Sequence, residues 1–375
     1  MIELTKLTDL NLSELPEISP EATKSYAENR QALVESVNDG LRNRDDLDQL
    51  IGDNPLELMY SNHENHARFM TNVFKLGNYS MMVRTIIWVY KTYHERGFSY
   101  DYFPVELESW TEAVKEHLKQ ENASGITKIY SFLINNHSKF VALSQKDGGS
   151  RLKVPEEWQE ASNEFLKALL DGNHREAMKI TDQNVNNQKQ VGDFFENMIS
   201  PAMYEIGSRW EEGKISVADE HLASSIVSRV LSTVYSRFIT YEETKGKAVV
   251  TAAANEFHEI GSRIIADSLE LDGWDVDHLG VDTPITDLVE MLVEKNPFLL
   301  GLSVAIPFNV DNALETIERV RSVPELEDMK ILIGGKAFND NPDLWKKTGA
   351  DAYGKDSKKA IEIAESWWRE AGRKG

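Results

Sequence analysis

The chain has 375 residues, more than one hydrophobic core usually holds, so we expect two or three domains. It contains no Cys, which excludes disulfides, iron–sulfur clusters, Cys-ligated zinc, thiol catalysis and thioether-linked prosthetic groups. The formal net charge is −21, from 41 basic and 62 acidic side chains, and a field of this sign disfavours binding to nucleic acid or to anionic membranes. Because no segment approaches the roughly 20 consecutive apolar residues of a membrane span, and the N-terminus has no basic and apolar leader, we expect a cytoplasmic protein with no membrane partner.

The first segment, residues 1–150, has the pattern of an all-helical domain. Residues 62–102 within it are dense in His, Phe, Tyr and Trp. Residue types alone favour the interpretation that these rings fill a helical core. Residues 146–150 (KDGGS) are typical of a linker, so we expect the domain to end there.

The middle segment, residues 151–242, predicts a four-helix bundle. Apolar residues recur at helical spacing and the connections between the runs are short. Ser216 has the residue type and position of an N-cap for the fourth helix. The polar segment 241–247 contains Gly246 and is a plausible joint between domains. The expected helices cover 157–170, a run beginning near 175, 191–210 and 216–239.

The last segment, residues 243–375, alternates between β-rich runs and helical patterns of ten or more residues. This alternation predicts parallel βαβ units and a Rossmann-like, doubly wound parallel sheet. Such sheets bind their ligands at the carboxyl ends of the strands. The expected strands are 247–253, 274–279, 299–305 and 330–333, and the expected helices are 262–270, 285–294, 310–320 and 358–371.

The loop after the first of these strands reads Glu256-Phe257-His258-Glu259-Ile260-Gly261. A His in this position can offer one ring nitrogen to a metal, while Glu256 can accept a hydrogen bond from the other ring nitrogen and fix the tautomer. The alternative is an ordinary polar loop with a His beside a carboxylate. Zinc is disfavoured, because no second and third ligand follow at metal-binding spacing.

This hexapeptide resembles the D/E-x-H-x-x-G loop of cobalamin-binding domains. In that family the His replaces the dimethylbenzimidazole tail as the lower ligand of cobalt, and the tail enters the sheet domain. The resemblance implies that His258 binds cobalt, and that a Ser hydroxyl and glycines without side chains surround the tail. Ala305 stands where the family often has Leu or Thr, which makes the wall of the site smaller. The residues that the resemblance assigns to the cofactor are Glu256, His258, Gly261, Ser303, Gly334, Gly335 and Gly354.

Trp210, followed after nine residues by Glu220-His221, resembles the adenosyl-capping signature of the CarH-type light-sensing cobalamin proteins. The resemblance implies that the bundle covers the upper face of adenosylcobalamin, with Trp210 against the adenosyl group and Glu220 and His221 beside it. Taken singly, a Trp at a helix end is typical of a core, and a Glu-His pair is typical of a solvated face. Glu211 stands where that family has a His that binds cobalt after illumination. The acidic first domain also differs from the family's basic DNA-binding domain, so we expect no nucleic-acid partner.

Two segments of the first domain, residues 62–90 (NHENHARFMTNVFKLGNYSMMVRTIIWVY) and 93–104 (YHERGFSYDYFP), resemble those of photocobilins. These light sensors pair cobalamin with biliverdin, a conjugated tetrapyrrole with two propionates. The resemblance implies a biliverdin site, which must be noncovalent in a chain without Cys. The candidate bilin-binding residues are His63, His66, Arg84, Trp88, Tyr93, His94 and Tyr102.

These resemblances together imply a light sensor that holds adenosylcobalamin and biliverdin. Light would break the cobalt–carbon bond and change the arrangement of domains or subunits, so we expect a homo-oligomer whose assembly depends on light, with an unidentified protein partner downstream. No nucleophile–base pair or general acid–base constellation is set by spacing, so we expect no enzyme. The alternative is a corrinoid methyl carrier that serves a methyltransferase. A third possibility is that the first domain is only a platform for protein interactions.

Overall fold

The computed structural model describes residues 10–146, 152–239 and 245–372 and divides the chain into two compact units. The first unit is residues 1–149 with 211–213, and the second is residues 150–210 with 214–375. Most of the predicted linker at 146–150 and of the predicted joint at 241–247 lies outside the described residues. Both predicted later domains, 151–242 and 243–375, fall mainly within the second unit, and their division into two separate domains remains a proposal. In the described part of the chain, no helix combines the length and apolar character needed to cross a bilayer.

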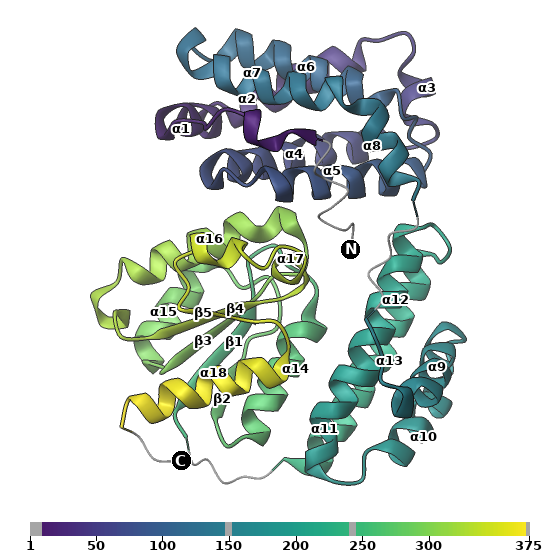
Figure 1. Ribbon diagram of the computed structural model, residues 1–375, viewed down its shortest axis with the longest axis vertical. Helices are drawn as coiled ribbons and strands as arrows, with labels where there is room; N and C mark the ends of the chain where they lie inside the picture. Colours follow the sequence, from purple (N-terminus) through teal and green to yellow (C-terminus); the bar gives the residue numbers. More distant parts are fainter. Residues whose placement is uncertain (1–9, 147–151, 240–244, 373–375) are drawn as a thin grey trace. The chain divides into compact units, whose positions relative to one another are not determined.

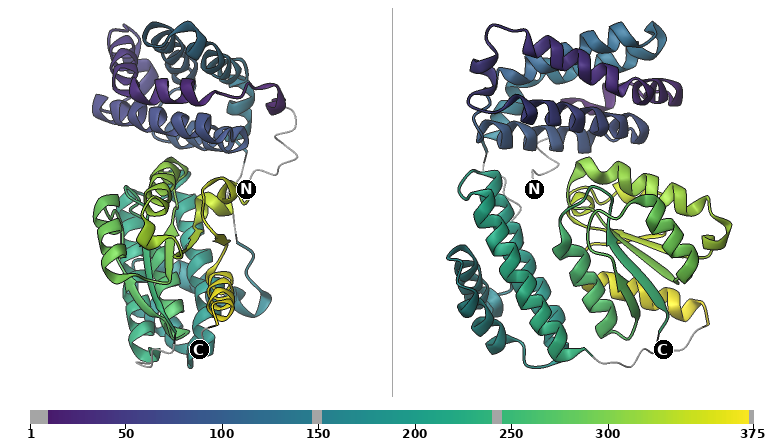
Figure 2. Two further views of the ribbon diagram at one scale, coloured as in Figure 1. Left: turned by 90° about the vertical axis from the view of Figure 1, so that its left-hand side faces the viewer. Right: turned by 180° about the vertical axis from the view of Figure 1, so that it is seen from behind.

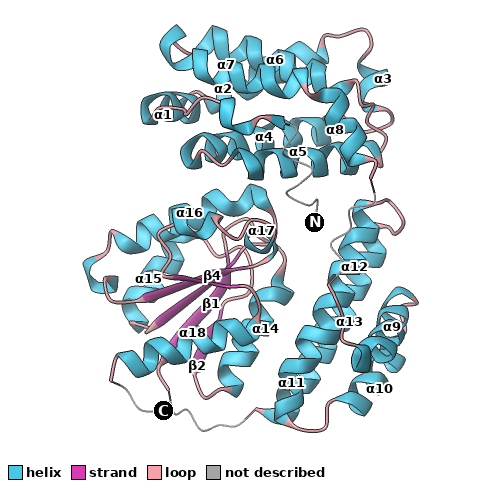
Figure 3. Cartoon of the chain, viewed as in Figure 1, coloured by secondary structure: helices cyan, strands magenta, loops and turns pink. Residues whose placement is uncertain are grey.

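The first unit is helical, as the sequence predicts (Figures 1 and 3). Helix boundaries follow local chemistry: the Asn78 side chain accepts a hydrogen bond from the amide of Met81, and Gly77 ends the preceding helix in the left-handed conformation. After a 3₁₀ turn at Leu12–Glu14, the helices are α1 (Pro20–Glu28), α2 (Arg30–Arg42), α3 (Leu47–Ile51), α4 (Leu56–Leu76), α5 (Tyr79–His94), α6 (Tyr102–His117), α7 (Gln120–Asn135) and α8 (His137–Ser144).

The interior of this unit contains polar side chains that are paired with one another. His63 of α4 is fully buried, with Nδ1 2.5 Å from Asn38 Oδ1 and Nε2 2.8 Å from Tyr102 Oη. Its neighbour one turn along, His66, lies 3.2 Å from Tyr130 Oη through Nε2. Burial lowers the pKa of both imidazoles to about 3, so both are neutral near pH 7.

Glu106 of α6 is the carboxyl group of this polar cluster. Its Oε1 accepts a hydrogen bond of 3.1 Å from Trp110 Nε1 and lies 3.9 Å from His66 Nδ1. Burial raises the pKa of Glu106 to about 7, although the Trp110 hydrogen bond acts in the opposite direction. The aromatic residues of α4 and α6 therefore form a core, as residue types alone suggest, but a core that contains titratable groups.

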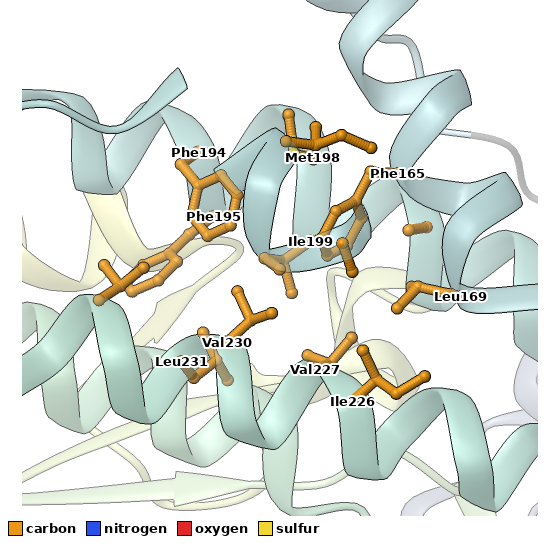
Figure 4. Packing of buried hydrophobic residues seen from close by; sticks show 14 of the residues in the cluster. Phe165, Leu169, Phe194, Phe195, Met198, Ile199, Ile226, Val227, Val230 and Leu231 are labelled. Carbon is orange, nitrogen blue, oxygen red and sulfur yellow. The ribbon is translucent and has the colours of Figure 1, made fainter. Parts of the chain in front are cut away.

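The helical part of the second unit has the predicted four segments. Ser216 begins the last of them with a capping box, since its Oγ accepts from the amide of Asp219 while the Asp219 carboxylate accepts from the amide of Ser216. Phe and branched aliphatic side chains from all four segments meet in one core (Figure 4). The helices are α9 (Glu156–Leu170), α10 (His174–Asn184), α11 (Gln188–Phe194), which continues through a π-helical turn (Phe195–Ile199) into α12 (Ser200–Glu211), and α13 (Val217–Phe238).

The remaining residues form a five-stranded parallel sheet in the order β2-β1-β3-β4-β5, which confirms the Rossmann-like, doubly wound prediction. The last strand has only three residues and is absent from the prediction. Helices α14 and α18 cover one face, and α15 and α16 lie on the other (Figures 1 and 2). The strands are β1 (Lys247–Ala252), β2 (Asp275–His278), β3 (Leu299–Ser303), β4 (Lys330–Gly334) and β5 (Ala352–Gly354), and the helices are α14 (Glu259–Leu271), α15 (Ile285–Lys295), α16 (Val310–Arg321), α17 (Lys336–Asn339) and α18 (Ser357–Glu370).

The register of the sheet brings distant landmarks into one row. Ala252 pairs with Ser303, Ser303 with Gly334, and Gly334 with Gly354, all at the carboxyl edge. The chain leaves β1 toward β2 and then returns to the other side of β1 to form β3. The loops after β1 and β3 therefore diverge at the topological switch point, where sheets of this kind bind ligands.

Gly335→Ala should destabilise the second unit by at least about 2 kcal/mol. Gly335 has φ of 101°, and a Cβ atom there would overlap the backbone carbonyl of Val304, which cannot move without disturbing β3. Gly192→Ala, a helical position with open space around the added methyl group, is the control and should be neutral or slightly stabilising. Urea unfolding followed by circular dichroism measures both, and equal midpoints for the two variants would contradict this account of the turn.

Glu106→Gln should gain stability relative to the wild type as the pH rises. The folded chain keeps a proton on Glu106 up to about pH 7, whereas the unfolded chain releases it near the ordinary carboxyl pKa. The stability that this raised pKa contributes is complete below the pKa of Glu106 in the unfolded chain and is lost as the pH rises through its pKa in the folded chain. The Gln side chain does not titrate, so the variant does not lose this stability. The free energy needed to open α6 should therefore be higher in Glu106→Gln than in the wild type, and this difference should grow by about 1–3 kcal/mol between about pH 5 and 7.5.

Amide exchange of α6 peptides, corrected for the intrinsic rate at each pH, measures this free energy. Glu108→Gln on the same helix is the control, because Glu108 is exposed. A Glu106→Gln advantage that does not vary with pH would show that this carboxyl is ionised in the folded chain at both values.

Candidate functional site

Glu256 lies in the loop after β1 and joins it to the loop after β3. Its side chain is fully buried, and Oε2 accepts hydrogen bonds from the backbone amides of Ala305 and Ile306, both at 2.9 Å, and from Asn309 Nδ2 at 3.2 Å. A buried carboxylate needs such donors to offset its lost hydration. The carboxylate therefore fixes the two loops of the switch point against each other.

The other oxygen of Glu256 holds His258. Oε1 lies 2.5 Å from His258 Nδ1 and also accepts from the His258 backbone amide at 3.2 Å. Burial alone would raise the pKa of Glu256, but the hydrogen bond and charge of His258, with the amide of Ile306 and Asn309, lower it. The hydrogen bond to Glu256 raises the pKa of His258 against the effect of desolvation. An ionised Glu256 places the imidazole proton on Nδ1 and leaves the lone pair of a neutral ring on Nε2.

The ring of His258 is presented outward from this anchor. The residue is the N-cap of α14, with extended backbone angles, and its side chain is 57% exposed. Phe257 beside it is 69% exposed, which is unusual for a large apolar side chain outside a binding surface. A half-exposed imidazole with one hydrogen-bonded nitrogen, beside an exposed apolar ring, can offer its other nitrogen to a metal that a second ligand already holds.

The chemistry of this donor set fits cobalamin better than a free ion. Among the residues that the structure describes, no three His, Asp or Glu side chains are grouped so that they could hold a metal ion. A corrin ring brings its own equatorial nitrogen ligands, so the protein needs to supply only one axial nitrogen. His258, with its Nδ1 proton held by Glu256, has the form of such a ligand.

The other predicted residues of the sheet domain lie near this site. The resemblance places the cofactor tail beside the glycines, whereas in the structure their nearest neighbours are backbone atoms of the protein. A Cβ at Gly334 would lie 2.7 Å from the carbonyl oxygen of Gly354, and one at Gly335 would overlap Val304. The space beside these glycines is thus taken by protein backbone. Gly261 lies against Ser303, whose Oγ would be 3.4 Å from an added Cβ. The structure brings together Glu256, His258, Gly261 and the row of Ser303, Gly334 and Gly354, and their contacts with a ligand remain predictions.

The predicted upper-face residues lie on either side of the turn between α12 and α13. Trp210 is half-buried near the end of α12. Glu220 is in the first turn of α13, where Oε1 accepts from Ser224 Oγ at 2.7 Å and Oε2 lies 3.6 Å from His221 Nε2. His221 is 73% exposed, and the charge of Glu220 contributes to the raised pKa of His258. The charge of Glu220 thus acts on His258, and His221 is open to solvent.

Sequence reasoning missed the groups that hold Glu256. Asn309 and the amides of Ala305 and Ile306 follow β3 in a loop without a recognised pattern. Their only signal is position, because this loop must face the loop after β1 in a sheet of this order.

Several of the candidate bilin-binding residues meet in the core of the first unit, because Tyr93 and Tyr102 both pack on Phe103 and His63 stacks on Tyr102. His63, His66 and Tyr102 are paired within the helical core by hydrogen bonds to Asn38, to one another and to Tyr130. His94 is exposed at the end of α5 and stacks on Tyr100 with ring centroids 3.9 Å apart. The partly exposed candidates are Arg84, Trp88 and Tyr93, all on α5.

Two parts of the second unit match families of known proteins. Residues 246–362 match a family described as B12 binding domain, and residues 161–235 match a second family of the same description. The chain is similar to dimethylamine corrinoid protein 1 of Methanosarcina mazei, with 26% identity over 187 residues, which are 48% of this chain and 85% of that protein. It is also similar to a corrinoid protein of Desulfitobacterium hafniense, with 21% identity over 207 residues, which are 54% of this chain and 94% of that protein.

Among solved structures, the monomethylamine corrinoid protein of Methanosarcina barkeri is 20% identical, with a TM-score of 0.49, and covers 56% of this chain and 98% of its own. The two B12 family matches include the helices of the bundle and the loop that carries Glu256 and His258. Since B12 is cobalamin, the resemblance to cobalamin-binding domains is confirmed: the second unit carries a cobalamin-binding module, made of a helical part and a Rossmann-like sheet.

Proposed function

We propose that His258 is the lower ligand of the cobalt and that the module serves a light sensor. The observation that supports the ligand is the Glu256–His258 pair, in which a buried carboxylate fixes the proton on Nδ1 and leaves Nε2 toward the exposed side. Ser303 and the glycines in register with it at the carboxyl edge are the residues that would border the displaced tail.

The upper face would be covered by the bundle. Trp210 would exclude water above the cobalt, and the Glu220 carboxylate would accept hydrogen bonds from ribose hydroxyls of an adenosyl ligand. Bound adenosylcobalamin would supply a cobalt–carbon bond that visible light breaks. Contacts of Trp210 and Glu220 with the adenosyl group would exist in the dark form alone, and this difference is what allows light to shift the arrangement of subunits in a homo-oligomer.

The first unit would extend the response to longer wavelengths by holding biliverdin without a covalent bond. Arg84 and Trp88, one turn apart on α5, are partly exposed on the same face of that helix, while Tyr93 packs on Phe98 and Phe103. A guanidinium can pair with a propionate and the rings can stack on pyrroles. The output would pass to a protein partner, and no catalytic step is assigned to this chain.

A corrinoid methyl carrier is the second candidate. The names of the relatives favour it more directly than they favour light sensing, because one is a dimethylamine corrinoid protein and the other a corrinoid protein, and both align over most of their own length. In this case the bundle would cover a methyl ligand and expose it to a methyltransferase. What favours the sensor lies in this chain alone: Trp210, the Glu220–His221 pair and a helical unit rich in buried rings.

His258→Ala should weaken the binding of adenosylcobalamin by at least about tenfold and change the visible spectrum of the bound cofactor, because the axial nitrogen is lost. The control is His174→Ala, which removes an exposed imidazole at the start of α10 in the same unit. Equilibrium dialysis in the dark measures the affinity. Unaltered affinity and colour in His258→Ala would refute the ligand assignment.

Illumination separates the sensor from the carrier. Wild-type protein with adenosylcobalamin should change its size in light scattering after illumination, while the complex with methylcobalamin, which lacks the adenosyl contacts, should have the same size in the dark and in the light. Trp210→Ala should lose most of the dark preference for adenosylcobalamin, and Trp210→Phe should retain part of it. Equal retention of both cobalamins, with no change of size in light, would favour the methyl carrier.

A further inference from the structure

The long helix from α11 to α12 is interrupted by a π-helical turn, Phe195–Ile199. Turns of this kind are rare and often mark functional positions, because the extra residue redirects the side chains around it. Phe195, Met198 and Ile199 point into the core of the bundle and are buried. Glu196 lies on the same turn but contacts a different element, outside the bundle core.

Glu196 binds the first residue of α18. Its Oε1 accepts hydrogen bonds from the backbone amide of Ser357 at 3.0 Å and from Ser357 Oγ at 2.6 Å. Ser357 is 2% exposed and Glu196 is half-buried, so both bonds are partly shielded from water. The first amides of a helix lack partners within the helix and carry a partial positive charge, which a carboxylate complements. A bundle side chain thus completes the N-terminus of a helix of the sheet domain.

This contact lies next to the carboxyl edge of the sheet. Ser357 follows Gly354, the end of β5, by three residues. A second polar link lies beside it, where Asn339 of α17 donates from Nδ2 to Tyr204 Oη of α12 at 3.3 Å and accepts at Oδ1 from Tyr353 Oη at 2.5 Å. Both links join the α11–α12 helix to the segments that follow β4 and β5.

A third contact between the bundle and α18 is an exposed ion pair. Lys358 Nζ lies 2.7 Å from Asp193 Oδ1, but the two side chains are 55% and 47% exposed. Exposed ion pairs contribute little to stability, because water and salt screen them and both side chains must be ordered. The half-buried carboxylate of Glu196, with two hydrogen bonds to a buried residue, is therefore the main polar anchor among these contacts.

We propose that Glu196 is a latch that holds the helical bundle on the β4–β5 side of the sheet edge and sets the rate at which a corrinoid enters and leaves the module. The proposal rests on the proposed cobalamin site. Any movement of the bundle away from that edge must break both bonds to Ser357 and leave the Ser357 amide, its hydroxyl and the carboxylate to be rehydrated.

Glu196→Ala tests the latch. In the protein without cobalamin, the amide of Ser357 should exchange with solvent about tenfold faster than in the wild type, because its charged acceptor is lost. The rates of association and dissociation of hydroxocobalamin, followed by stopped-flow absorbance, should both rise about tenfold, and their ratio should change less. Glu196→Gln, which keeps an acceptor oxygen without the charge, should have a smaller effect on all three rates.

Two controls make the outcome specific. Glu176→Ala removes a carboxylate of the same bundle that pairs with Lys179 of its own helix, and Lys358→Met removes the exposed ion pair. Both should leave the three rates within about twofold of the wild type. Circular dichroism establishes that each variant is folded.

Unchanged exchange of the Ser357 amide in folded Glu196→Ala would overturn the latch, and so would faster exchange with unchanged cobalamin rates. If the wild type fails to bind cobalamin, the proposed function is wrong, and the exchange measurement still decides whether Glu196 closes the contact.

Discussion

The buried carboxylate of Glu256 is the interaction on which the candidate site depends. One oxygen takes three donors from the loop after β3, and the other holds the imidazole of His258. Replacing the donors would leave a buried charge without partners, and moving either loop would release the ring. The strand order brings these two loops together, because β1 and β3 are neighbours at the point where successive strands stop being added on one side of β1 and are added on the other. A local ligand geometry is thereby set by the topology of the whole sheet.

Periodicity was sufficient to predict the four helical segments of the bundle and the four longer strands and four longer helices of the sheet domain, because helices and buried strands impose different spacings on apolar residues. It could not find β5, whose three residues are too few for a pattern. It also could not find Asn309 or the amides of Ala305 and Ile306, since loop contacts depend on which loops face each other. The Glu256–His258 pair was predictable from its spacing of two residues, whereas the neighbours of Gly334 and Gly335 were not.

The helical unit illustrates the limit of residue type as evidence. A ring-rich segment is compatible with a core and with a chromophore site, and the structure has both buried, paired rings and partly exposed rings on α5. The cluster around Glu106 contains titratable groups in an apolar interior, and hydrogen bonds among these groups offset the free energy of their desolvation. Such a cluster specifies which rings meet.

The most direct test of the account is electron paramagnetic resonance of cob(II)alamin bound to protein in which only the His residues carry ¹⁵N. An axial imidazole nitrogen couples to the unpaired electron of cobalt, and the coupling pattern depends on the nitrogen isotope. The account predicts that the pattern changes from that of ¹⁴N to that of ¹⁵N, and that the change is lost in His258→Ala. A pattern of ¹⁴N in the labelled wild type would mean that the cofactor keeps its own tail on cobalt, which would contradict the role assigned to His258.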